Sequence, residues 1–125
     1  MKHIDLNTED FVIFSCFQGN SLAEDCEATG KVDISLMLLD IPYNKCVGVY
    51  KGKQETSFAV PLSHVWVAKD YCKLYNQECY LEVVKGVSSM VFDESKETLG
   101  NWTEIEEPSG DYTFDKLANK YYIIK

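Results

Sequence analysis

Arginine is absent from this sequence, in which all 12 basic residues are lysines. Arginine is the residue best suited to bidentate recognition of phosphates and carboxylates. Its absence therefore argues against a protein that reads bases or grips a phosphodiester backbone, although an AT-rich genome would also explain it. We expect no direct binding to nucleic acid.

Histidine is almost absent as well, with His3 in a polar lead and His64 at the start of a predicted helix. A nucleophilic triad needs an oriented base beside a serine or cysteine, and nothing in the spacing around His64 demands one. No cluster has the paired ligand spacing of a zinc site, and neither a GxGxxG nor a P-loop motif occurs. We predict no catalytic residue, no metal and no cofactor. Whether the protein is an enzyme stays open, with a non-enzyme favoured.

The sequence also lacks a signal peptide, a CxxC pair and any apolar run of membrane-spanning length. Its five cysteines make an odd number, and three of them, Cys46, Cys72 and Cys79, lie in apolar patterns. Cysteine in such a setting behaves as a small hydrophobic residue. We expect five reduced thiols, no membrane partner and a cytoplasmic location.

Negative charge is abundant and unevenly spread, with 20 acidic residues and a formal net charge of −8. Residues 1–40 carry 8 acids and 2 lysines (net −6), 41–92 carry 4 and 6 (net +2), and 93–115 carry 8 and 1 (net −7). A solvated surface is the ordinary explanation. The alternative is an acidic face that is offered to a basic partner.

The most regular part of the chain is residues 45–84, which read as strand, turn, strand, helix and strand. Gly52 marks a turn between the strands at 46–50 and 56–60. Ser63 is a suitable N-cap for an amphipathic helix over 63–75. Residues 79–84 alternate as a half-buried strand does.

Two further elements precede this stretch, a buried strand over 11–17 and a helix over 32–41, separated by an acidic loop at 18–31 that contains one helical turn. The order β-α-β-β-α-β over residues 11–84 predicts an α+β, ferredoxin-like core with an antiparallel sheet. A C-terminal β extension at 85–125 adds strands at 87–92 and 120–125. Residues 93–111 are expected to form an acidic loop that Trp102 and Ile105 pin to the body. The whole chain, 1–125, is predicted to be one domain.

Trp66 is a candidate interface anchor, because tryptophan buries much area at low entropic cost and lies here on the lysine-bearing side of its helix. A fold-back of the acidic tail over it is the alternative. The predicted partner-binding residues are Trp66, Lys69, Lys73, Glu104, Glu106 and Glu107. The segment after the first strand is a candidate ligand loop, or else a plain connection, and its residues are Gln18, Asn20, Ser21, Glu24, Asp25 and Glu27. The three acids lack the Asp/Asn ladder of a calcium loop.

The pattern GVYKGKQETSFAV, a helix and then YNQECYLEV, together with QGNSLAEDCEATGKV, resembles small phage-encoded accessory proteins of uncharacterised function. The resemblance covers residues 11–84. It implies a viral accessory protein that acts in the host cytoplasm, by binding and inhibiting a host factor.

Three functions stay open at this point. The first is an inhibitor of a host or defence protein, with imitation of nucleic acid by its acidic surface left open. A homodimer is an open alternative for its assembly. The second is a small-ligand or nucleotide-sequestering protein that uses the loop at 18–31. The third is a small enzyme that uses the acidic residues of that loop.

Overall fold

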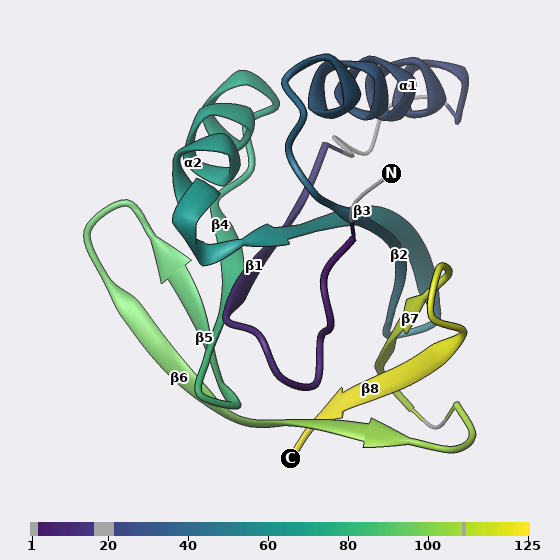
Figure 1. The fold of residues 1–125 in the computed structure, drawn as a ribbon, viewed down its shortest axis with the longest axis vertical. Coiled ribbons are helices and arrows are strands. Elements are labelled where there is room, and N and C mark those ends of the chain that lie inside the picture. The colour runs from purple at the N-terminus through teal and green to yellow at the C-terminus, as the bar shows by residue number, and fades with distance from the viewer. Residues whose placement is uncertain (1–2, 17–21, 109) are drawn as a thin grey trace.

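Eight antiparallel strands close into a barrel in the computed structural model of the chain, which describes residues 3–16, 22–108 and 110–125 (Figure 1). The strand order around the barrel is β1-β3-β2-β7-β8-β6-β5-β4. The strands are β1 Phe11–Ser15, β2 Asn44–Tyr50, β3 Lys53–Pro61, β4 Cys79–Val84, β5 Val87–Phe92, β6 Lys96–Ile105, β7 Tyr112–Asp115 and β8 Lys120–Ile124. The helices are α1 Leu22–Leu38, the short 3-10 turn η1 Leu62–His64, and α2 Val65–Leu74.

The predicted ferredoxin-like fold class is wrong, because the sheet does not end at β2 and β4. Strand β2 pairs with β7, where Cys46 lies opposite Asp115. Strand β4 pairs with β5, where Cys79 lies opposite Phe92. Both predicted edge strands therefore have a second neighbour, and the sheet closes on itself into a mostly-β barrel.

The acidic stretch predicted as a loop at 93–111 contains the ten-residue strand β6 and leads into β7. Trp102 is its main apolar contact with the core, as expected from the sequence, and it packs against a buried cluster inside the barrel. Most of the other β6 side chains are exposed. A strand with one solvent-facing side needs few apolar residues, so hydrophobic periodicity alone could not reveal β6.

Two tight hairpins set the register of the barrel. The β2–β3 turn is Lys51-Gly52, with φ of 50° and 80°, and the β4–β5 turn is Lys85-Gly86, with φ of 50° and 78°. Positive φ at both central residues is the requirement of a type I′ turn, whose twist matches that of the flanking strands. Glycine at the second position meets this requirement without steric cost.

The N-terminal segment 3–10 fills one end of the barrel and is seen inside the ring of strands in Figure 1. Ile4 and Leu6 are 3% and 2% exposed and join the interior cluster of Phe11, Ile13, Cys46, Ala59, Val83 and Tyr122. Asn44 fixes the segment, since its side chain accepts a hydrogen bond from the Ile4 amide (3.0 Å) and donates one to the Ile4 carbonyl (2.8 Å). The same Nδ2 donates to the buried carboxylate of Asp115 (2.9 Å).

Both helices pack on the outside of the barrel over a second buried cluster, which includes Phe14 and Phe58 from the sheet, Leu36 from α1 and Val67 from α2. Helix α1 begins at Leu22, so the expectation of a largely loop-like segment at 18–31 is wrong for residues 22–31. Helix α2 is confirmed, but its N-cap is His64 without a side-chain cap bond, rather than Ser63.

All five cysteines are free in the structure, which confirms the predicted absence of disulfides. Within the described part of the chain, neither helix has the length and apolar character needed to span a membrane.

Candidate functional site

A cavity of about 480 Å³ lies in the barrel, with walls from all eight strands. Its apolar lining includes Ile13, Leu81, Met90, Trp102 and Tyr122. Its polar lining includes Lys53, Glu55, Ser57, Asp111 and Thr113. Small-molecule sites are typically apolar cavities of about 300–1,000 Å³ with a few placed polar groups, and this cavity fits that description.

Trp102 and Tyr122 form an aromatic wall of the cavity. Their rings stack with centroids 4.9 Å apart at 16°, and Phe11 meets Trp102 edge-on at 5.3 Å. Burial, helped by the charges of Glu104 and Asp115, raises the pKa of Tyr122 far above its ordinary value, so its phenol stays neutral. The buried Nε1 of Trp102 has no hydrogen-bond partner among the described residues. A buried donor without an acceptor is costly.

Glu55 and Ser57 bring polar groups onto the inner side of β3. Side chains alternate between the two faces of a strand, and Ala59 of the same strand belongs to the interior cluster. Glu55 lies opposite Gly48, which has no side chain to fill the space beside it. Carboxylates near aromatic rings suit a ligand that carries positive charge, because both attract a cation.

A second cleft, of about 520 Å³, lies between α2 and the β4–β5 hairpin and is lined by Lys69, Cys72, Lys73 and Cys79 among others. It is slightly larger than the barrel cavity, but it has no aromatic wall of stacked rings. Burial raises the pKa of the Cys72 thiol to about 11. Since the thiolate is the reactive form of cysteine, Cys72 is not an activated nucleophile there. We take the barrel cavity as the candidate site.

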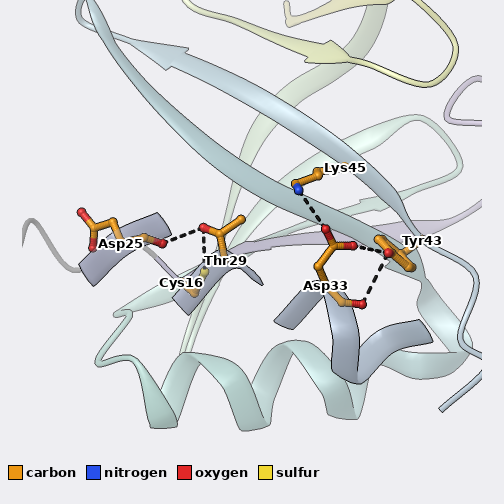
Figure 2. A network of polar contacts seen from close by, with 6 residues as sticks. All are labelled: Cys16, Asp25, Thr29, Asp33, Tyr43 and Lys45. Carbon is orange, nitrogen blue, oxygen red and sulfur yellow. Dashed lines mark hydrogen bonds and ion pairs between the residues drawn. The ribbon is translucent and has the colours of Figure 1, made fainter. Parts of the chain in front are cut away.

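A polar network outside the barrel holds α1 on the sheet (Figure 2). Lys45 donates to the Asp33 carboxylate at 2.8 Å, and the Tyr43 hydroxyl donates to the other oxygen of the same group. Partial burial acts to raise the pKa of Asp33, but the hydrogen bonds from Lys45 and Tyr43 outweigh it and hold that pKa below its usual value. Burial and then the bond to Asp33 raise the pKa of Tyr43 to about 12. One turn away, the Thr29 hydroxyl donates to the Asp25 carbonyl at 2.9 Å and lies 3.5 Å from the Cys16 sulfur. These contacts fasten α1 to the barrel.

The structure does not gather the predicted partner-binding residues on one surface. Trp66, Lys69 and Lys73 lie on α2, whereas Glu104 is near the end of β6 and Glu106 and Glu107 follow it, on the far side of the barrel (Figure 1). Glu104 accepts a hydrogen bond from Asn7 (2.5 Å) and pairs with Lys120 at 3.6 Å. His64 is the N-cap of α2 and does not line the barrel cavity.

The predicted ligand loop is only partly described. Gln18, Asn20 and Ser21 lie outside the described residues, and Glu24, Asp25 and Glu27 lie in the first turns of α1. None of these three acids lines the barrel cavity. Among the described residues, no group of three or more His, Cys, Asp or Glu side chains has the arrangement of a metal site.

Sequence reasoning did not select Glu55, Ser57 or Tyr122 as site residues. The signal in β3 is weak, because residues 53–57 are all polar and Glu55 and Ser57 differ from their neighbours only in sharing a face with the buried Ala59. That face of β3 lies inside the barrel only because β5–β8 close the sheet. The periodicity of β3 alone cannot predict this closure.

Fold and cavity together describe a small closed β-barrel with a small-molecule-sized site at its open end. The model of the S-adenosylmethionine lyase family matches residues 12–125, which include α1, α2 and nearly all of the barrel. The chain therefore belongs to the S-adenosylmethionine lyase family. No curated protein matches the sequence.

Proposed function

We propose that this protein is an enzyme that binds S-adenosylmethionine in the barrel cavity and cleaves it without water. The observation that carries the proposal is the family match over residues 12–125. A lyase breaks a bond of its substrate without hydrolysis, and the weak bonds of S-adenosylmethionine are those from carbon to its positively charged sulfur. Cleavage leaves the bonding electron pair on sulfur as a neutral thioether, which is a good leaving group. Without water, the carbon is satisfied either by the carboxylate oxygen of the substrate itself, which closes a lactone, or by loss of a proton from the neighbouring carbon, which forms a double bond.

The lining of the cavity supports this substrate. S-adenosylmethionine carries an aromatic base, a sulfonium cation and an amino-acid group with one charge of each sign. The partly exposed Trp102, stacked on the buried Tyr122, offers an aromatic surface, and aromatic faces attract cations. Glu55 and Asp111 supply negative charge and Lys53 one positive charge. The net charge of −8 also favours the approach of a cationic ligand.

Glu55 is the residue that we assign to the positive part of the substrate. It comes from the inner side of β3 and lies opposite Gly48, where space is left for a ligand. The cavity lining also includes the apolar Leu81 and Met90. Apolar groups around a reacting bond favour loss of the thioether within the substrate over attack by water.

The test is to incubate the purified protein with S-adenosylmethionine and to follow substrate and products by mass spectrometry. We expect one thioether product for each substrate consumed, with no oxygen from ¹⁸O-labelled water in either initial product. Glu55→Gln should lower kcat/KM by a factor on the order of 10²–10⁴, the range typical for a placed charged group. Glu94→Gln changes an exposed glutamate outside the cavity and should leave the rate unchanged. Retention of full activity in Glu55→Gln would exclude the cavity assignment, and no turnover by the wild type would exclude the lyase.

We infer further that the protein is a phage accessory protein that acts in the host cytoplasm. The support is the resemblance to phage proteins over residues 11–84 together with the family match. Removal of S-adenosylmethionine would deprive host methyltransferases and S-adenosylmethionine-dependent restriction systems of a required molecule. Anti-defence action of this kind needs no complex with a host protein.

Binding of a host or defence protein through an acidic surface is the second candidate function. It is favoured by the net charge of −8 and by exposed glutamates such as Glu106 and Glu107 after β6. Expression in bacteria separates the two candidates. If the protein acts by cleavage, Glu55→Gln should abolish protection of an incoming phage from restriction, and Glu106→Gln with Glu107→Gln should preserve it. The opposite pattern would favour the binding inhibitor.

A further inference from the structure

The end of α2 brings two cysteines together in the cleft of about 520 Å³ between this helix and the β4–β5 hairpin. The helix ends in a Schellman motif, in which the Gln77 amide donates to the Cys72 carbonyl at 2.8 Å. The Asn76 amide donates to the Lys73 carbonyl at 3.4 Å, and Asn76 has the left-handed conformation that the motif requires, with φ of 54°. The chain is thereby tied back to Cys72, and Cys79 follows shortly afterwards, at the start of β4.

The two thiols are neighbours. The Sγ of Cys72 donates to the carbonyl oxygen of Cys79 at 3.6 Å, and both residues line the cleft. After burial, the charge of Cys79 is the next largest cause of the raised pKa of Cys72, which agrees with sulfurs that lie close together. A disulfide needs Cβ atoms about 3.5–4.5 Å apart, and two residues in direct contact are near this range.

The cleft offers positive charge beside the thiols. Lys69 and Lys73 lie one turn apart on α2, line the cleft and form no ion pair within the described part of the chain. Glu78 and Asp93 add negative charge to the same lining. Glutathione disulfide carries more carboxylates than amino groups, so both kinds of charge in this lining have a counterpart on that molecule.

We propose that Cys72 and Cys79 are a redox pair, which a small anionic disulfide of the glutathione type converts to an internal disulfide in this cleft. Cys79 is the more exposed of the two, and its thiolate attacks one sulfur of the reagent. A bond forms between the two sulfurs, the disulfide of the reagent breaks, and one glutathione leaves as a thiolate with the electron pair. The Cys72 thiolate then attacks the Cys79 Sγ, and the second glutathione leaves in the same way. Two protein thiols are oxidised, the reagent is reduced to two thiols, and the departing thiolates take up the two protons.

The pair is reduced in the structure, and its oxidation is slow near neutral pH. Burial raises the pKa of both thiols, and only a thiolate attacks a disulfide. The exchange therefore becomes faster as the pH rises towards these pKa values. Once formed, the bond joins the end of α2 to the start of β4, the strand whose Leu81 lines the barrel cavity.

The test is to incubate the reduced, full-length protein with glutathione disulfide at mildly alkaline pH, alkylate the remaining thiols, cleave after lysine and identify the peptides by mass spectrometry. Cleavage at Lys73 separates the two cysteines, which then lie in peptides 70–73 and 74–85. We expect these two peptides to be joined, and to separate when reduced glutathione is added in large excess. Glutathione on the exposed Cys26 without any joining of the two peptides would overturn the proposal.

Serine variants test the order of the two steps. In Cys72→Ser, glutathione should stay on Cys79, because the thiol that displaces it is gone. In Cys79→Ser, Cys72 should stay unmodified, since it is only 7% exposed. Cys26→Ser changes an exposed cysteine outside the cleft and should form the joined peptides at the rate of the wild type. A lasting glutathione adduct on Cys79 of the wild type, with Cys72 alkylated, would show that the two sulfurs do not meet.

Lys69→Gln tests recognition of the anionic reagent. Loss of this positive charge should slow the reaction with glutathione disulfide several-fold and leave the reaction with the neutral hydroxyethyl disulfide unchanged, because only the anion is attracted. Lys116→Gln changes an exposed lysine between β7 and β8 and should react with both reagents as the wild type does. Equal slowing of both reactions by Lys69→Gln would reject the role of charge. The readout is a bond between two thiols rather than turnover of S-adenosylmethionine, so this proposal and the proposed lyase activity are tested separately.

Discussion

The two ends of the barrel are built from the same strands and differ in what fills them. At one end, Ile4 and Leu6 occupy the interior, and Asn44, which also donates to Asp115, satisfies the backbone groups of Ile4. At the other end, the interior is left as a cavity with Glu55 among its polar groups and Trp102 in its wall. The filled end is built for stability, and the open end keeps polar and aromatic groups ready for a ligand.

Deletion of residues 93–125 should have the largest effect, because it removes β6, β7 and β8 and opens both ends at once. The loss exposes the interior cluster around Phe11 and takes away Tyr122, one of its buried members. We expect no cooperative thermal unfolding by circular dichroism, whereas Glu107→Gln in the same segment should unfold as the wild type does. A sharp transition in the shortened chain would show that residues 1–92 form a core of their own.

Asn44→Ala should destabilise the filled end by about 3 kcal/mol. The change leaves the Ile4 amide and carbonyl without the Asn44 side chain and removes one of the donors to the Asp115 carboxylate, which keeps the amides of Leu117 and Ala118. Each buried polar group left unsatisfied costs roughly 1–3 kcal/mol. Urea unfolding measures the difference. Ser57→Ala is the control at the open end, where the side chain lines the cavity, and it should change stability by less than about 0.5 kcal/mol. Equal losses of stability in Asn44→Ala and Ser57→Ala would show that the two ends of the barrel contribute equally to stability.

Asp33→Asn should have the smallest effect and should depend on pH. Residue Asp33 sits outside the barrel beside the start of β2, where Lys45 and Tyr43 hold its pKa below the usual value. A carboxyl whose pKa is lowered by folding adds stability above its unfolded pKa and loses it as the pH falls through the folded pKa. With partial exposure taken into account, we expect a loss of about 1 kcal/mol near neutral pH.

The difference between wild type and Asp33→Asn should therefore shrink below about pH 4, the ordinary range of aspartate. Urea unfolding of both proteins across this range is the measurement. A difference that grows as the pH falls would contradict the assigned role of the Lys45 and Tyr43 contacts. Lys31→Gln, which removes an exposed ion pair with Glu27, is the control and should show little dependence on pH.

Local patterns were sufficient for most elements of the first two thirds of the chain, but not for residues 22–31 of α1. The apolar run at Phe11, the alternation over 79–84 and the glycines at the hairpin turns each predicted an element that the structure contains. These local patterns could not predict the candidate cavity. Glu55 and Tyr122 are far apart in the sequence, and only the complete ring of strands makes them walls of one space.

The sequence by itself determined the strands and helix α2 before residue 92, the free state of the cysteines and the strong negative charge, since each depends on composition or on neighbours in the chain. Tertiary structure alone decided that the sheet closes, because pairing of β2 with β7 and of β6 with β8 joins segments whose own side chains are mostly polar or mixed. Closure also decided which face of β3 became an interior. Hydrogen bonding between strands determines closure of the sheet and the inner face of β3. Such pairing is a property of two segments together and cannot be read from either segment alone.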